Sequence, residues 1–199
     1  MRLLAILIGM SLFADLHLKD ATDLQQIMWS CYWGAIAVAS GMLIVSERLV
    51  AWGTVFFAGL GVPAWILGQV LDFHLEVTSV LIHTLPLVAG LLYLRRMSAL
   101  PVHTYLGAWS LYVVPFLLSW AFTSPKQMIN LSHWRRSAVP SLPFNVWQFY
   151  VLLMPLTLST ILLADWLINR WLMRRESARA GLVVAAGDPQ RTTPSQRRA

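Results

Sequence analysis

Charged residues are scarce in this chain of 199 residues. Asp, Glu, Lys and Arg together account for 12% of the sequence, whereas hydrophobic residues account for 57% and the mean hydropathy is +0.61. A soluble domain has about 25% charged residues, so this chain has too few charges to cover a surface that faces water. The scarcity of charge excludes an ordinary soluble domain and predicts an integral membrane protein.

Cysteines and metal-binding motifs are scarce as well. Cys31 is the only cysteine, which excludes an internal disulfide and a cysteine-based zinc site. Its apolar surroundings favour a small buried side chain over a reactive thiol. Imidazole and carboxylate ligands suit zinc or iron, but the sequence has no HxxxH or HExxH motif. We therefore predict no metal and no cofactor.

The sequence consists mainly of long apolar runs. A transmembrane helix needs about 20 residues, and five runs approach or reach that length, at residues 26–45, 49–70, 77–94, 105–122 and 147–168. Many tryptophans lie near the ends of these runs, as expected at a bilayer interface; they are Trp29, Trp33, Trp52, Trp120, Trp147, Trp166 and Trp171. We predict an all-α polytopic bundle of about six spans, five clear and one short at the N-terminus.

The N-terminal run and the C-terminal tail set the limits of this bundle. Residues 3–16 form a short apolar run that could be a span, an interfacial helix or a signal peptide. The poor cleavage site after it favours a retained short span. The last residues lose apolar periodicity and gain Pro, Thr, Gln and Arg. We predict a transmembrane domain at residues 1–176 and a disordered basic cytoplasmic tail at residues 177–199.

The net charge of +6 follows membrane orientation rather than nucleic-acid binding. Arg2, Arg48, Arg95, Arg96 and the arginines of the tail fall on one side of a six-span arrangement, which the positive-inside rule makes cytoplasmic. We expect both termini in the cytoplasm and the protein in the bacterial inner (plasma) membrane. The expected partners are membrane lipids and other membrane proteins, with no nucleic acid.

A polar stripe leads into the third run. Asp72, Glu76, Ser79 and His83 fall within roughly 60° of one another if they share one helix. His83 then lies roughly 10 Å beyond Glu76, with Ser79 between them. An ionisable side chain inside a membrane is costly and suggests function, so His83 is a candidate base, held in one tautomer by Ser79 and the acids. The alternative is a buried histidine that only fixes helix packing.

The loop at residues 123–146 breaks the orientation rule. It lies on the outer side of the predicted topology, yet it carries Arg135 and Arg136 close to Asn130 and His133. Guanidinium groups match phosphate oxygens, so these four residues are candidates for binding a lipid head group. The alternative for the arginines is snorkelling to the interface.

Small residues mark the second run. Gly53, Gly59, Gly61 and Gly68, together with Pro63, make it thin and easily kinked. Small residues allow close approach of transmembrane helices. We therefore expect the second run to pack against the third.

The segment VTSVLIHTLP resembles the T-S-x-x-x-H…P segment of glycerophosphocholine acyltransferase-like membrane proteins. With the later segment INLSHW, it also resembles uncharacterised bacterial multi-span proteins. The resemblance covers about twenty residues; the matching positions are Thr78, Ser79, His83, Pro86, Asn130, Leu131 and Trp134. It implies a polytopic lipid enzyme with His83 as catalytic base.

Three functions are compatible with these patterns. The first is an enzyme that acts on a lipid or acyl group at the outer leaflet, with His83 as base, Glu76 or Asp72 orienting it, and the 123–146 loop holding a head group. The second is a small proton-coupled transporter that uses Asp72, Glu76 and His83 as a proton path. The third is a non-catalytic scaffold or assembly subunit of other membrane proteins.

Overall fold

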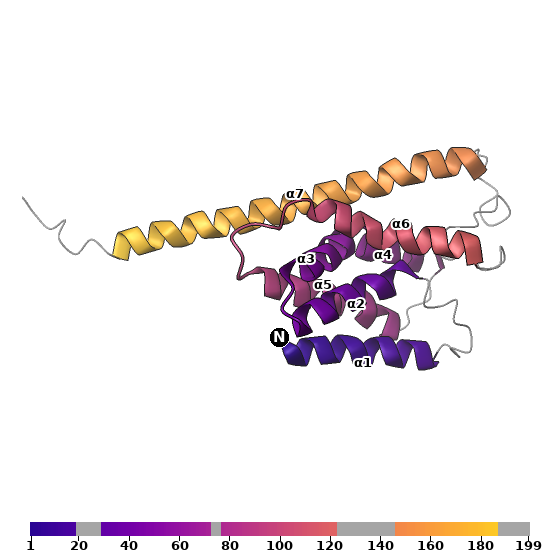
Figure 1. Cartoon of the computed structure of the whole chain (residues 1–199), viewed down its shortest axis with the longest axis horizontal. Coiled ribbons are helices and arrows are strands. Elements are labelled where there is room, and N and C mark those ends of the chain that lie inside the picture. Colours follow the sequence, from indigo (N-terminus) through magenta and orange to yellow (C-terminus); the bar gives the residue numbers. More distant parts are fainter. Residues whose placement is uncertain (19–28, 73–76, 123–145, 187–199) are drawn as a thin grey trace, which may run out of the picture.

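The computed structural model describes residues 1–18, 29–72, 77–122 and 146–186, and the regular structure within these ranges is entirely helical. Figure 1 shows the order of the elements. They are α1 (Arg2–Leu18), α2 (Ser30–Leu43), α3 (Glu47–Phe56), the π-helical segment η2 (Phe57–Gly61), α4 (Val62–Asp72), α5 (Val77–Leu94), α6 (Thr104–Phe122) and α7 (Val146–Ala186). Because α3, η2 and α4 follow one another without a break, the described residues form six rods, each at one of the predicted apolar runs.

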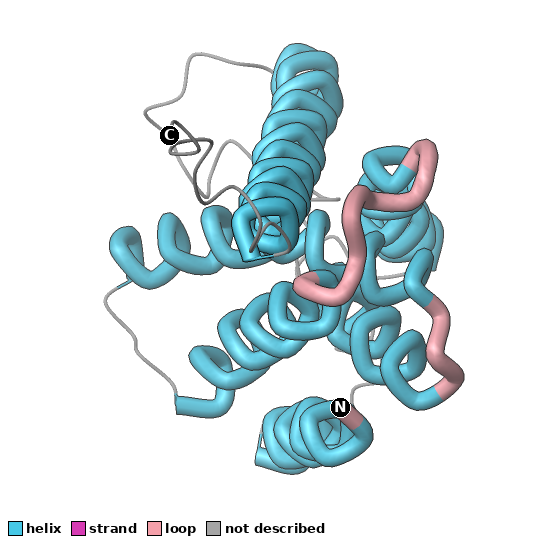
Figure 2. The backbone as a smooth tube through the Cα atoms, turned by 90° about the vertical axis from the view of Figure 1, so that its left-hand side faces the viewer, coloured by secondary structure: helices cyan, strands magenta, loops and turns pink. Residues whose placement is uncertain are grey.

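Several of these rods have the length and composition of membrane spans. Glu47–Leu67, Thr104–Phe122 and Gln148–Leu182 are long and apolar enough to cross a bilayer, and Ser30–Leu43 and Thr78–Leu94 are shorter apolar helices. The all-helical fold class is thus confirmed. Seen from the end that carries the N-terminus, α1 lies at one edge of the bundle (Figure 2).

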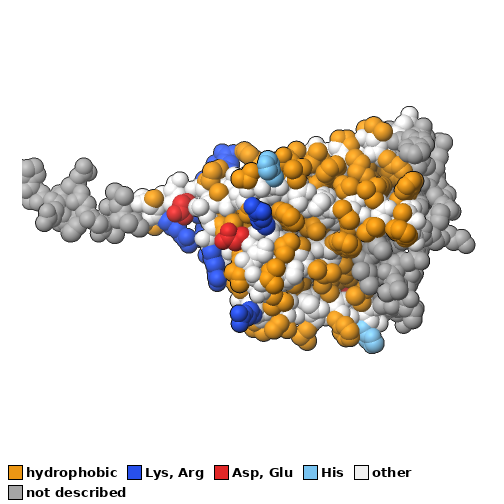
Figure 3. Space-filling view, in the orientation of Figure 1, with side chains coloured by type: hydrophobic (Ala, Val, Ile, Leu, Met, Phe, Trp, Pro, Cys, Tyr) orange, Lys and Arg blue, Asp and Glu red, His pale blue; other side chains and the backbone are white. Residues whose placement is uncertain are grey.

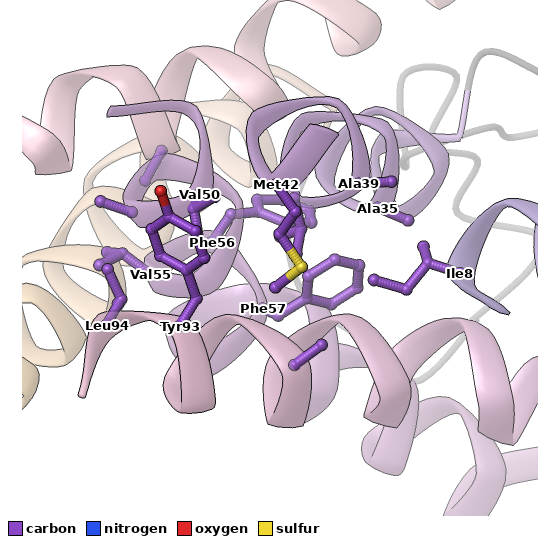
Figure 4. Close-up of a cluster of buried hydrophobic side chains, with 14 of the residues drawn as sticks. Ile8, Ala35, Ala39, Met42, Val50, Val55, Phe56, Phe57, Tyr93 and Leu94 are labelled. Atoms are coloured by element: carbon purple, nitrogen blue, oxygen red, sulfur yellow. The ribbon is translucent and has the colours of Figure 1, made fainter. Parts of the chain in front are cut away.

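Helix α3 and η2 form the centre of the bundle, with α2, α5, α6 and α7 packed around them. Val50, Val55 and Phe57 are completely buried there. Figure 4 shows these side chains converging with apolar side chains of α1, α2 and α5, among them Ile8 and Met42. A helix buried on all sides must be apolar around its whole circumference, which fits the sequence of this segment.

Glycines bring the neighbouring helices close to this central rod. A Cβ atom added at Gly53 would lie 2.5 Å from Cγ2 of Val38 and 2.7 Å from the main-chain oxygen of Gly34, so α2 and α3 nearly touch. A Cβ at Gly90 of α5 would collide with the hydroxyl of Thr54. The predicted packing of the second run against the third is therefore confirmed, since α5 contacts both α3 and η2.

The arginines of the described ranges gather at one end of the molecule, and apolar side chains cover most of the body (Figure 3). Nη1 of Arg175 donates to the main-chain oxygen of Arg95 at 3.1 Å. The side-chain oxygen of Asn169 accepts from the main-chain nitrogen of Leu100 at 3.1 Å. These bonds fasten α7 to the connection between α5 and α6 at the arginine end.

Helix α7 continues to Ala186, beyond residue 177, where the sequence predicted the start of a disordered tail. The residues past this boundary include Arg, Ala and Leu, which are strong helix formers. Upstream, Arg170 lies 5.0 Å from the ring centre of Trp166 and Arg175 lies 5.2 Å from that of Trp171. In Figure 1 the C-terminal part of α7 extends past the other helices. The remainder of the predicted tail, residues 187–199, lies outside the described residues.

Candidate functional site

Only part of the predicted site falls within the described residues. Ser79 and His83 lie near the start of α5, and both are half-buried. Asp72 is the last residue of α4. Glu76 and the four predicted head-group residues, Asn130, His133, Arg135 and Arg136, lie outside the described residues.

The predicted stripe required Asp72 and His83 to share one helix, and the structure corrects this. The rings of Trp65 and His83 stack with their centres 5.4 Å apart. These residues are 18 positions apart, so one continuous helix would separate them by about 27 Å. Helices α4 and α5 are therefore separate rods that pack side by side. What faces His83 is therefore decided by α4 as a neighbour, not by helical spacing from Asp72.

Ser79 holds the imidazole of His83, but through its main chain. Nδ1 of His83 lies 2.7 Å from the main-chain oxygen of Ser79. A carbonyl oxygen can only accept a hydrogen bond, so Nδ1 carries the proton and Nε2 is the basic nitrogen of the neutral ring. The hydroxyl of Ser79 has a different partner: it accepts from Nε1 of Trp65 at 2.9 Å.

Two aromatic side chains enclose the ring of His83. Trp65 of α4 stacks on it at an interplanar angle of 15°, and Phe57 of η2 meets it edge-on, with ring centres 6.3 Å apart and an angle of 88°. We call His83, Ser79, Trp65 and Phe57 the His83 site. The sequence did not single out Trp65 or Phe57. The available signal was that Trp65 lies inside an apolar run, away from its ends, where its indole N–H needs a polar partner.

The π-helical segment positions one wall of the His83 site. Phe57 is its first residue and is completely buried. A π-helical turn inside an α-helix widens the helix locally and occurs frequently at functional sites. Here it follows the tightly packed α3 segment and presents Phe57 to α5. The site is thus built by the central rod and by α5, which are both held by buried contacts.

The structure reveals a second buried polar group, which the sequence analysis did not single out. Asp15 of α1 is 1% exposed, and its Oδ2 accepts a hydrogen bond from the hydroxyl of Tyr32, itself 4% exposed. Helices α1 and α2 pack against each other, and this packing removes the carboxylate from the surface. Asp15 is therefore an interior residue, not a surface charge. The only signal in the sequence is its position inside the run LFADLHL.

The Asp15–Tyr32 pair and His83 lie at the same level of the bundle. Arg2 of α1 and Arg96, just after α5, line a single cavity, so these two helix ends are adjacent. Asp15 is thirteen residues from Arg2, and His83 is thirteen residues from Arg96. Thirteen residues of helix span about 20 Å. Gly34, two residues after Tyr32, packs against the rings of Phe56 and Phe57, which connects the pair to the His83 site through α2 and η2.

This level of the bundle has the elements of proton chemistry. It combines an imidazole of fixed tautomer with a buried carboxylate and a phenol. Among the residues that the structure describes, no cluster of three or more His, Cys, Asp or Glu side chains could hold a metal ion.

Comparisons with protein-family models, with curated proteins and with solved structures found no match to this chain.

Proposed function

We propose that the protein is a polytopic membrane enzyme of about six spans that acts on a lipid or acyl group, with His83 as general base. The hydrogen bond from Nδ1 of His83 to the main-chain oxygen of Ser79, at 2.7 Å, carries this proposal. It directs the basic Nε2 away from the backbone of α5. The resemblance of VTSVLIHTLP to acyltransferase-like membrane proteins supports the same role for His83.

The proposed location follows from the arginines. If they face the cytoplasm of a bacterial inner membrane, both termini are cytoplasmic. His83, about 20 Å away along α5, then belongs to the outer half of the bilayer. The ester bonds of phospholipids lie just below the head groups, so a base at that depth could meet them.

The proposed reaction is transfer of an acyl group between two oxygens. Nε2 of His83 removes the proton from an acceptor hydroxyl as its oxygen attacks the acyl carbonyl. The tetrahedral intermediate then expels the original alcohol, which takes the same proton from the imidazolium, so His83 ends unchanged. The carbonyl of Ser79 stabilises the imidazolium through Nδ1–H, and the face of Trp65 adds a cation–π contribution.

Replacement of His83 tests this function. In proteoliposomes of phosphatidylethanolamine and phosphatidylglycerol with added lysophospholipid, we expect His83→Gln to slow acyl exchange about a hundredfold, because general bases contribute at least that much. Mass spectrometry of the lipids measures the rate.

Thr84→Ala is the matched control for this experiment. The hydroxyl of Thr84 donates to the main-chain oxygen of Val80 in the same helix at 2.7 Å and is not part of the His83 site, so exchange should stay near the rate of the parent protein. Unchanged exchange in His83→Gln would refute the role of His83 as base.

The buried Asp15 supports a second candidate function, a proton-coupled carrier. A buried carboxylate inside a membrane frequently belongs to a proton relay, and Asp15 lies at the level of His83. We expect Asp15→Asn to abolish proton uptake by proteoliposomes under an imposed gradient, read with a pH-sensitive dye inside the vesicles. Uptake that persists in Asp15→Asn would remove this candidate.

A further inference from the structure

A charged cavity opens at the arginine end, far from the His83 site. It has a volume of about 380 Å³, and its walls include Arg2, Glu47, Arg96, Tyr93, Met42 and Met97. Four rods meet there, since these residues come from α1, α2, the start of α3 and the end of α5. None of these residues belongs to the proposed enzyme site.

The charges around this cavity are of both signs and do not neutralise one another. Arg2, Glu47 and Arg96 line the same space, yet within the described part of the chain none of them forms an ion pair. An exposed ion pair contributes little stability, so these side chains gain little by pairing with one another. Here the cavity separates them, and a ligand that carries both a negative and a positive group could contact them together.

The cavity continues on the other side of Glu47. A neighbouring cavity of about 400 Å³ shares Val45, Glu47 and Met97 with the first and adds Ser46 and Arg48. Among the described residues that line the two cavities, Glu47 is the one acid, at the junction of a groove with arginines on both sides. The turn before Glu47 has an unusual backbone conformation. Val45 has a φ of 59°, which a β-branched residue rarely adopts.

We propose that this groove binds the phosphoammonium head group of a phosphatidylethanolamine-type lipid. The guanidinium groups of Arg2 and Arg96 suit the phosphate oxygens, which they can engage with paired N–H donors. The carboxylate of Glu47 accepts hydrogen bonds from the primary ammonium group. Basic pockets between transmembrane helices are established sites for lipid head groups.

The apolar part of the cavity favours a lipid over a free solute. Met42 is 2% exposed and Tyr93 is 6% exposed, so both belong to the core and form a firm floor below the charges. Met97 and Val45 add apolar wall. Val45 is 71% exposed, and free phosphoethanolamine carries the same charges but has no glycerol or acyl carbons to cover this apolar wall.

Native mass spectrometry of the detergent-purified protein tests this site. With equal amounts of phosphatidylethanolamine, phosphatidylglycerol and phosphatidylcholine, we expect the parent to retain phosphatidylethanolamine preferentially. Phosphatidylglycerol lacks the ammonium group, and the trimethylammonium of phosphatidylcholine has no N–H to donate. Arg96→Gln should lower retained phosphatidylethanolamine about tenfold, as expected for a charge-assisted hydrogen bond. Glu47→Gln should reverse the preference in favour of phosphatidylglycerol.

Arg170→Gln is the matched control, because Arg170 lies over Trp166 and does not line the cavity. It should retain lipid as the parent does, and thermal unfolding of each variant verifies that it is folded. Equal retention of the three lipids, or an unchanged preference in Glu47→Gln, would overturn the proposal. Displacement of the lipid by millimolar free phosphoethanolamine would assign the site to the soluble compound instead.

Discussion

Gly53→Leu should destabilise the bundle by at least about 3 kcal/mol, at or above the upper range for overpacking a core. The first side-chain atom would already lie 2.7 Å from the main-chain oxygen of Gly34 and 2.5 Å from Val38. A main-chain atom cannot rotate away as a side chain can, so α2 and α3 must separate. Because α3 is the central rod, its other neighbours must shift with it. The loss of stability is measured by heating the detergent-solubilised protein and determining the remaining folded fraction by size-exclusion chromatography.

Gly9→Leu is the control for this substitution. A Cβ at Gly9 meets nothing within 4 Å, and Gly9 lies on the exposed face of α1. It adds the same side chain to a helix of the same bundle, so its unfolding temperature should match or exceed that of the parent. If Gly53→Leu and Gly9→Leu unfold at the same temperature, close packing at Gly53 does not hold the bundle together.

Tyr32→Phe should cost about 3 kcal/mol, because it removes a hydrogen-bond donor from a buried acidic side chain. Asp15 is almost completely enclosed, so water cannot easily replace the phenol. The two rings have nearly the same shape, and the loss therefore reports the hydroxyl rather than a cavity. Asp15→Asn should cost less, since its amide oxygen still accepts from Tyr32.

Tyr105→Phe provides the comparison for Tyr32→Phe. Tyr105 is half-buried, and its ring packs against His103, but its hydroxyl makes no hydrogen bond within the described ranges. Its removal should leave the unfolding temperature close to that of the parent. Equal effects of the two substitutions would show that the Asp15–Tyr32 bond contributes nothing specific to stability.

The central helix shows how much of the helix packing can be predicted from a pattern in the sequence. The glycines of the second run predicted a thin helix that packs against the third, and Gly90 against Thr54 confirms this contact. The sequence did not show that the same helix also receives α2, α6 and α7. Small residues indicate that another helix can approach closely, but they do not indicate which helix does so.

The candidate site shows the same limit. His83 could be selected from the sequence, because an ionisable residue inside an apolar run is costly. Its true surroundings, Trp65 and Phe57, come from another rod of the bundle. The burial of Asp15 against Tyr32 likewise follows from the packing of α1 on α2 and not from its neighbours in the sequence.

By itself, the sequence determined the class of protein, the positions of its helices and the side of the apolar runs on which the arginines lie. These properties depend on composition and on the length of apolar runs, which are local and need no partner. The tertiary structure alone decided that Asp15 is buried against Tyr32, that Trp65 covers His83, and that Arg2, Glu47 and Arg96 surround one cavity. Each of these depends on contacts between helices far apart in the chain, which close packing selects and local hydropathy does not encode.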